Sequence, residues 1–165
     1  MFDEAGEDEL LLAAMMQLGA KGGSMGAAAS GAVTGVHGTG GAGAQGGARG
    51  AARGFKWTKK DVSTAVVELS GTVTAVSELV HRTLSDVGSL IGAQARDGGG
   101  VAVRAMVGMG MGGLNPTVVT AVVVPGPEGV AVVRLRAAGR EGLIKRHPAD
   151  HALARITDRL RGASR

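Results

Sequence analysis

The stretch TVVTAVVVPGPEGVAVVRLRA, residues 117–137, decides the fold class. Its two ends, 117–124 and 130–137, are rich in valine, a residue that favours β-strands. The PGPEG segment between them contains two prolines, which the interior of a strand does not accept, and it predicts a tight turn. Because strands joined by short turns run antiparallel, this stretch predicts a β-hairpin within an antiparallel sheet.

The chain just before the hairpin adds two further strands. VAVRAMV at 101–107 predicts one strand, and residues 89–95 predict a shorter one, with a turn at the GGG of 98–100 between them. A glycine loop, GMGMGGLNP at 108–116, connects to the hairpin. We expect residues 117–124 to form an edge strand, whose unpaired backbone groups would be covered by self-association.

Residues 62–91 allow two interpretations. Apolar residues recur every three or four positions, as in one long helix. However, eight of the fifteen residues from Val62 to Val76 are valine or threonine, which favour strands, and Gly71 interrupts the run. We favour a strand at 62–69, a turn at Ser70–Gly71 and a helix ending at Gly88.

A last helix is predicted from Ala149 to Leu160, with apolar residues on one face and Gly162 as a stop. The order strand, helix, strands, helix predicts an α+β fold with a single antiparallel sheet of about four or five strands. We expect two helices to pack on one face of the sheet, behind a disordered Gly/Ala-rich arm.

The first part of the chain differs in composition. Residues 1–20 predict a short helix with acidic residues at its start. Residues 21–56 predict a flexible linker with a basic end, because 14 of the 30 glycines lie between Gly19 and Gly54 and such a tract buries little side chain. GxxxG spacings such as Gly19/Gly23 are interpreted as chance matches. The compact domain is predicted at 57–162.

Composition excludes several classes of protein. Without cysteine the chain has no disulfide, thiolate nucleophile or Cys-based metal site. The acidic N-terminus is not a signal peptide, and the apolar run 10–20 is too short to span a bilayer, so we expect a soluble cytoplasmic protein. Phe2, Phe55 and Trp57 are the only aromatic residues in the sequence, so few side chains are available to stack on planar ligands.

Two groups of cations are candidates for weak, non-specific binding of nucleic acid. The first is a basic arm around an aromatic residue, and the second is a sheet face whose arginines we expect to point into solvent. The residues are Arg49, Arg53, Lys56, Trp57, Lys59 and Lys60 in the arm, and Arg104, Arg134 and Arg136 on the sheet. The alternative is that Phe55 or Trp57 packs against the domain and the cations only keep the arm in solution.

The segment REGLIKRHPADHALARI, 140–156, contains two histidines and several acidic and basic residues that could act as metal ligands or as acid–base groups. His147 and His151 have the i, i+4 spacing of zinc ligands, but Pro148 displaces His147 from helical conformation, so the stretch is interpreted as a helix start. Glu141 and Lys145 are a weak candidate for an acid–base pair. We expect no metal and no cofactor.

The glycine loop contains a GxGxxG match at Gly108, Gly110 and Gly113. Dinucleotide binding requires a helix after such a loop, whereas here a strand is predicted, so we reject the match. Met106, Met109 and Met111 are a weak candidate for an adaptable apolar contact surface.

Three functions remain. The leading hypothesis is a non-enzymatic interaction domain or small apolar-ligand-binding domain that associates with itself or with another protein. The second is the weak nucleic-acid binding described above. The third is a small enzyme that uses Glu141, Lys145, His147 or His151, which requires these groups to converge in a pocket.

Overall fold

The computed structural model describes residues 6–34, 40–109, 115–141 and 146–163. The chain forms two compact units, one made of residues 6–59 and one that begins at residue 60. The elements of the larger unit are, in chain order, β1 (Lys59–Ser70), α3 (Val73–Val87), β2 (Gly88–Arg96), β3 (Gly100–Met109), β4 (Asn115–Pro125), β5 (Val130–Glu141) and α4 (Pro148–Ala163).

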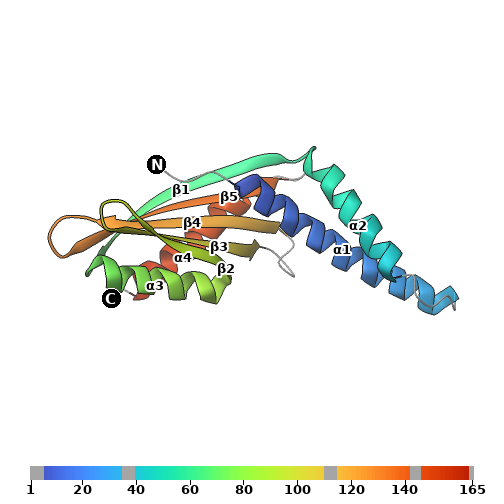
Figure 1. Ribbon diagram of the computed structural model, residues 1–165, viewed down its shortest axis with the longest axis horizontal. Helices are drawn as coiled ribbons and strands as arrows, with labels where there is room; N and C mark the ends of the chain where they lie inside the picture. The colour runs from blue at the N-terminus through green and yellow to red at the C-terminus, as the bar shows by residue number, and fades with distance from the viewer. Residues whose placement is uncertain (1–5, 35–39, 110–114, 142–145, 164–165) are drawn as a thin grey trace. The chain divides into compact units, whose positions relative to one another are not determined.

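The strands of this unit form a five-stranded sheet in the order β1-β5-β4-β3-β2 (Figure 1). The pairs β2–β3, β3–β4 and β4–β5 are antiparallel. The amide of Gly71 donates to the carbonyl of Gly129 over 2.8 Å, which joins the end of β1 to the start of β5. The α+β class with one antiparallel sheet is confirmed.

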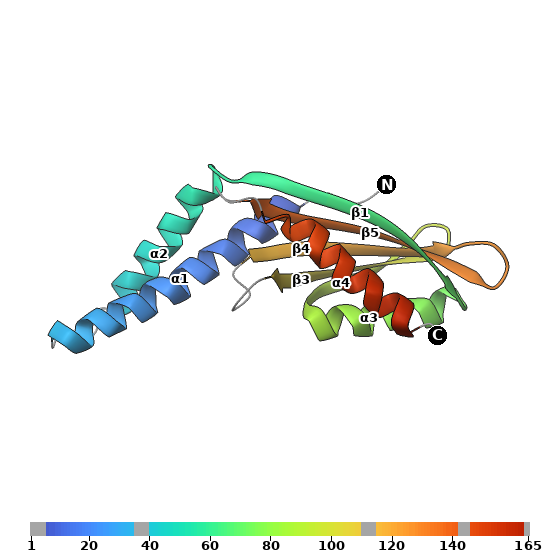
Figure 2. The ribbon, with the colours of Figure 1, turned by 180° about the vertical axis from the view of Figure 1, so that it is seen from behind.

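Both helices of this unit pack on one face of the sheet. α4 passes behind the strands in Figure 1 and in front of them in Figure 2. Alternate residues of β3, such as Val103 and Ala105, point into one core with Leu84 of α3 and Ile156 of α4. The opposite face of the sheet therefore carries the intervening residues of each strand.

The region 62–91 is divided as the β-branched residues predicted. β1 ends at Ser70, Gly71 follows with a φ of 132°, and α3 begins at Val73. The Thr72 hydroxyl caps the helix by accepting from the Ala75 amide, and Gly88 forms the C-cap. The strand–turn–helix interpretation is confirmed, and the single long helix is wrong.

The prediction that 117–124 is an edge strand is wrong. β4 lies at the centre of the sheet, hydrogen-bonded to β3 on one side and β5 on the other. Its valine-rich sequence matches this position, since a central strand has neighbours on both sides and is covered by helices. The two edges of the sheet are β1 and β2.

The glycine-rich region is helical where the structure describes it, so the flexible linker predicted at 21–56 is wrong as local structure. α1 runs through Glu7–Thr34 and α2 through Gly40–Phe55. The helix predicted within 1–20 thus continues into the glycine tract. No helix within the described ranges is long and apolar enough to cross a membrane.

Glycine explains how α1 and α2 pack. A Cβ atom added at Gly23 would overlap the carbonyl oxygen of Gly43, and one at Gly47 would overlap that of Gly19. The GxxxG spacing of Gly19 and Gly23, interpreted above as chance, therefore faces the matching pair Gly43 and Gly47 and lets the two backbones touch. The close contact of these two helices therefore depends on glycine, because any larger residue at these positions would push the backbones apart.

Candidate functional site

A groove lies between α3 and the strands β2 and β3. Its volume is about 380 Å³. Ser77 and His81 line it from α3 one helical turn apart, and Val101 and Val103 line it from alternate positions of β3. Ala93, the register partner of Val103, completes the floor from β2. The groove thus has a carbon-rich floor and a more polar helical wall.

The helical wall carries the groups that can orient a ligand. Glu78 and Arg82, again one turn apart on α3, line the groove beside His81. The Ser77 hydroxyl oxygen is buried and has no hydrogen-bond partner in the part of the chain that the structure describes. Leaving such an oxygen without a partner costs about 1–3 kcal/mol. A ligand that hydrogen-bonds Ser77 would recover part of this free energy.

A second, smaller hollow of about 200 Å³ lies on the other face of the same strands. Gln94 of β2 and Ala102 and Arg104 of β3 line it, at positions that alternate with those of the groove. Arg104 Nε donates to the Thr120 hydroxyl over 3.1 Å. This hydrogen bond holds the guanidinium against the sheet. Because Gln94 and Arg104 line this hollow while valines floor the groove, the groove is the more apolar of the two.

The strand between the two hollows is an open edge. β2 is exposed from Ser89 to Ala95, and Leu90 and Ile91 are 36% and 43% exposed. Its only charged residue is Arg96 at the end, whereas the other edge, β1, carries Lys59, Lys60 and Glu68. Charges on an edge strand oppose pairing with another chain, so β2 is the less protected edge.

The three arginines predicted on one sheet face do share it, but not all are exposed. Arg104 and Arg136 are both register partners of Thr120, and Arg134 lies two residues along β5 from Arg136. Arg134 is exposed, Arg104 is half-buried and Arg136 is only 8% exposed. The prediction of a fully solvated arginine face is therefore wrong at Arg136, although it holds at Arg134 on the same strand.

The basic segment at 49–60 is exposed but ordered. Its cations, Arg49, Arg53, Lys56, Lys59 and Lys60, are all exposed. Trp57 is 89% exposed, whereas Phe55 is half-buried. The Trp57 amide donates to the Gly54 carbonyl over 2.9 Å, and the Thr58 hydroxyl donates to that of Phe55 over 2.8 Å. A hydrogen-bonded turn thus presents the indole beside the cations.

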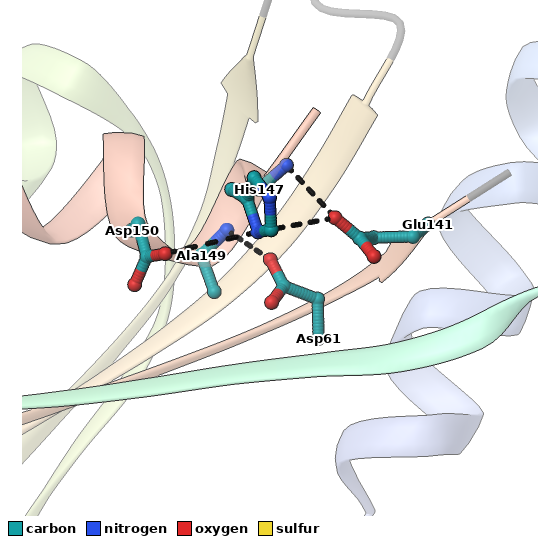
Figure 3. A network of polar contacts seen from close by, with 5 residues as sticks. All are labelled: Asp61, Glu141, His147, Ala149 and Asp150. Carbon is teal, nitrogen blue, oxygen red and sulfur yellow. Dashed lines mark hydrogen bonds and ion pairs between the residues drawn. The ribbon is translucent and has the colours of Figure 1, made fainter. Parts of the chain in front are cut away.

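The polar cluster at the start of α4 brings together residues from three elements (Figure 3). Asp61 lies on the face of β1 that also carries Val67 and Leu69, and Glu141 lies on the face of β5 that carries Leu135. His147 immediately precedes α4 and has a φ of 43°, which is uncommon for a residue other than glycine. Alternation along the two strands thus directs both carboxylates to the helix start.

Both carboxylates hydrogen-bond amides at this helix start. The Ala149 amide donates to Asp61 Oδ2 and the His147 amide to Glu141 Oε1, each over 2.9 Å. His147 Nδ1 lies 3.4 Å from Glu141 Oε1 and 3.9 Å from Asp150 Oδ2. The prediction that Pro148 keeps His147 out of the helix is confirmed, and α4 begins at Pro148, one residue before the predicted start.

The groups named for a small enzyme converge only in part. Glu141 and His147 meet, whereas His151 is exposed and outside the cluster, and Lys145 lies outside the described residues. Asp61 is a residue that the sequence did not single out for this position. Its contact with Ala149 joins residues 88 positions apart, and no local pattern indicates such a pairing.

The remaining candidates of the glycine loop are described in part. Met106 is half-buried in β3 and Gly108 also belongs to that strand, whereas Met111, Gly110 and Gly113 lie outside the described residues. Met109 ends β3, and its side chain is likewise not described. The next described element is the strand β4, which agrees with rejecting the dinucleotide motif. The methionine contact surface stays a prediction.

Solved structures resemble this chain at low sequence identity. A START superfamily protein from Mycobacterium smegmatis is 10% identical with a TM-score of 0.40, over 62% of this chain and 96% of that one. The lipid transfer and protein localization domain of human StarD13 is 12% identical with a TM-score of 0.40, over 63% and 77%. Norcoclaurine synthase from Thalictrum flavum, in complex with dopamine and hydroxybenzaldehyde, is 12% identical with a TM-score of 0.35, over 66% and 88%.

No family model and no curated protein matches the sequence.

Proposed function

We propose that this chain is a non-enzymatic binding domain that takes a small, largely apolar ligand in the groove between α3 and the β2–β3 edge. The observation that supports this most is Ser77, a residue that lines a groove floored by Val101 and Val103. Its buried hydroxyl has no hydrogen-bond partner among the described residues. Apolar walls with a few placed polar groups are typical of small-molecule sites. The ligand class is an aliphatic or alicyclic body with one hydrogen-bonding end.

The wall of α3 suggests where that end lies. Ser77 and Arg82 both line the groove, so a carboxylate or hydroxyl at the end of the ligand has two candidate donors. Glu78 lines the same wall and disfavours an anion there. Comparing decanoate with decanol measures which of these two effects dominates.

The test is calorimetric titration of the full chain with decanoate and decanol. Ala93→Phe places a ring on the groove side of β2 at an exposed position, so we expect it to abolish saturable binding without unfolding the domain. Gln94→Phe adds the same ring to the opposite face of the same strand and should leave binding unchanged. Equal loss in both variants, or no saturable binding by the unmodified chain, contradicts the proposal.

Self-association is the second part of the proposal, and β2 is the strand that supports it. An antiparallel pairing of β2 with its copy around a two-fold axis would satisfy the outward backbone groups of both strands. We expect sedimentation velocity to detect a dimer, and the double substitution of Leu90 and Ile91 by lysine to return it to monomer. A monomer at every concentration contradicts this part and leaves the groove untouched.

A second candidate function is favoured by one specific observation, the 89% exposure of Trp57 among cations. We propose weak binding of single-stranded nucleic acid, in which the indole stacks on a base while Arg49, Arg53, Lys56 and Lys59 contact phosphates. Trp57 is the only tryptophan, so its fluorescence reports on this site alone.

The corresponding test titrates the chain with oligothymidylate. We expect quenching of Trp57 fluorescence with an affinity that falls steeply as salt rises. Arg53→Glu should weaken binding more than the matched exposed change Arg155→Glu on α4. Quenching that is absent at low salt rules this candidate out.

A further inference from the structure

Asp61, Glu141 and His147 each offer a ligand atom, and these atoms all lie within 4.8 Å of one another. We propose that they bind a divalent transition-metal ion, with Zn²⁺ as the ion tested first. One oxygen from each carboxylate and Nδ1 of His147 are the ligands. This site lies outside the groove and does not depend on the function proposed there.

The two carboxylates are held in place by the backbone. Asp61 Oδ2 accepts from the Ala149 amide and Glu141 Oε1 accepts from the His147 amide, each over 2.9 Å. Each carboxylate keeps a second oxygen for which the described residues offer no hydrogen bond. Helix capping thus accounts for one oxygen of each residue and leaves one of each available to a cation.

Capping does not account for the imidazole. His147 Nδ1 lies 3.4 Å from Glu141 Oε1. Atoms arranged tetrahedrally at about 2.1 Å from a metal are about 3.4 Å apart, so this pair has the spacing of two ligands on one ion. Oε1 has a second lone pair, so it can also bind the ion while it accepts from the His147 amide. The widest separation in the group, 4.8 Å at most, needs only side-chain rotation to close.

The local charge favours a cation. The start of α4 contributes the positive end of its dipole, equivalent to roughly half a unit charge. Asp61 and Glu141 together carry two negative charges, and Asp150 adds a third within 3.9 Å of His147 Nδ1. The carboxylates therefore outweigh the dipole, and Asp150 contacts His147 from the side opposite Glu141 (Figure 3).

The set of donor atoms selects the class of metal. Imidazole nitrogen with carboxylate oxygens suits Zn²⁺, Mn²⁺ or Co²⁺, whereas Mg²⁺ and Ca²⁺ prefer oxygen ligands alone. Glu141 is 14% exposed and His147 is 56% exposed at the side chain, so the ion has a route from solvent. Bound metal would link β1, β5 and α4 at one point.

The experiment is calorimetric titration of the full chain with Zn²⁺, followed by Co²⁺ absorption spectroscopy to detect nitrogen ligation. We expect one equivalent of Zn²⁺ to bind, a rise in the thermal unfolding midpoint, and much weaker binding of Mg²⁺. His147→Ala should weaken Zn²⁺ binding by more than about tenfold. His151→Ala is the matched control, because His151 is exposed on the same helix but outside the group, and it should bind as the unmodified chain does.

Two further variants separate ligation from capping. Asp61→Asn and Glu141→Gln keep an oxygen that accepts from the same backbone amide, so the fold should persist while Zn²⁺ binding falls. Circular dichroism of each variant checks the fold. The proposal is overturned if Zn²⁺ shows no saturable binding, or if His147→Ala and His151→Ala behave alike; His147 is then only an ion-pair partner of Glu141 and Asp150.

Discussion

The two units of this chain pack by opposite means. In the unit that begins at residue 60, large apolar side chains such as Leu135, Leu84 and Ile156 fill the space between sheet and helices. In the unit of residues 6–59, α2 has no buried residue, and glycines bring the helix backbones together. Burial of side-chain area stabilises the first contact, and the absence of Cβ atoms permits the second. Substitutions that change side-chain size should therefore act in opposite directions in the two units.

The largest effect is expected from removing volume in the sheet unit. Ile156→Ala deletes a fully buried side chain that faces the sheet, and we expect it to lower the free energy of unfolding by about 2–5 kcal/mol. Urea denaturation followed by circular dichroism measures the change. Val66→Ala is the control, because Val66 is 60% exposed and the same kind of truncation there should cost less than about 0.5 kcal/mol. Similar costs at both positions would contradict the side-chain packing described here.

Adding volume to the helical unit should have the next largest effect. In Gly47→Ala the new methyl group meets the Gly19 backbone, so we expect a loss of about 1–3 kcal/mol and faster hydrogen exchange in α1 and α2.

Gly46 is the neighbouring residue, and apart from its own stretch of helix no described atom lies within 4 Å of its added Cβ. Gly46→Ala should instead stabilise α2 by up to about 1 kcal/mol, since alanine is the better helix former. Opposite signs at adjacent glycines are the distinctive result, and equal effects at the two sites would argue against backbone contact between the helices.

The smallest expected effect concerns a helix end in the sheet unit. Thr72→Ala removes the hydroxyl that accepts from the Ala75 amide, and we expect α3 to lose about 1 kcal/mol. Thr72→Ser keeps the hydroxyl and should be nearly neutral. Hydrogen exchange of the first turn of α3 provides the measurement. If serine is as costly as alanine, the threonine methyl group, not the cap, is responsible.

Some candidate sites could be predicted from residues adjacent in the sequence, whereas others depend on contacts between distant segments. The exposed cations around Trp57 could be named from the sequence, since they are contiguous. The groove could not, because Ser77 and Val103 belong to elements whose packing no local signal specifies. Asp61 was noticeable only as a polar residue near the start of a strand, and its role at α4 depends on β1 lying beside β5.

The sequence by itself determined the strands, the turn at Gly71, the end of α3 at Gly88 and the exclusion of His147 from α4. These features follow from backbone preferences of residues adjacent in the chain. Only the tertiary structure decided that β4 is central, that glycines of α1 and α2 meet, and that Asp61 reaches His147. Each of these depends on which distant segments become neighbours, and that outcome reflects the free energy of the whole packed chain.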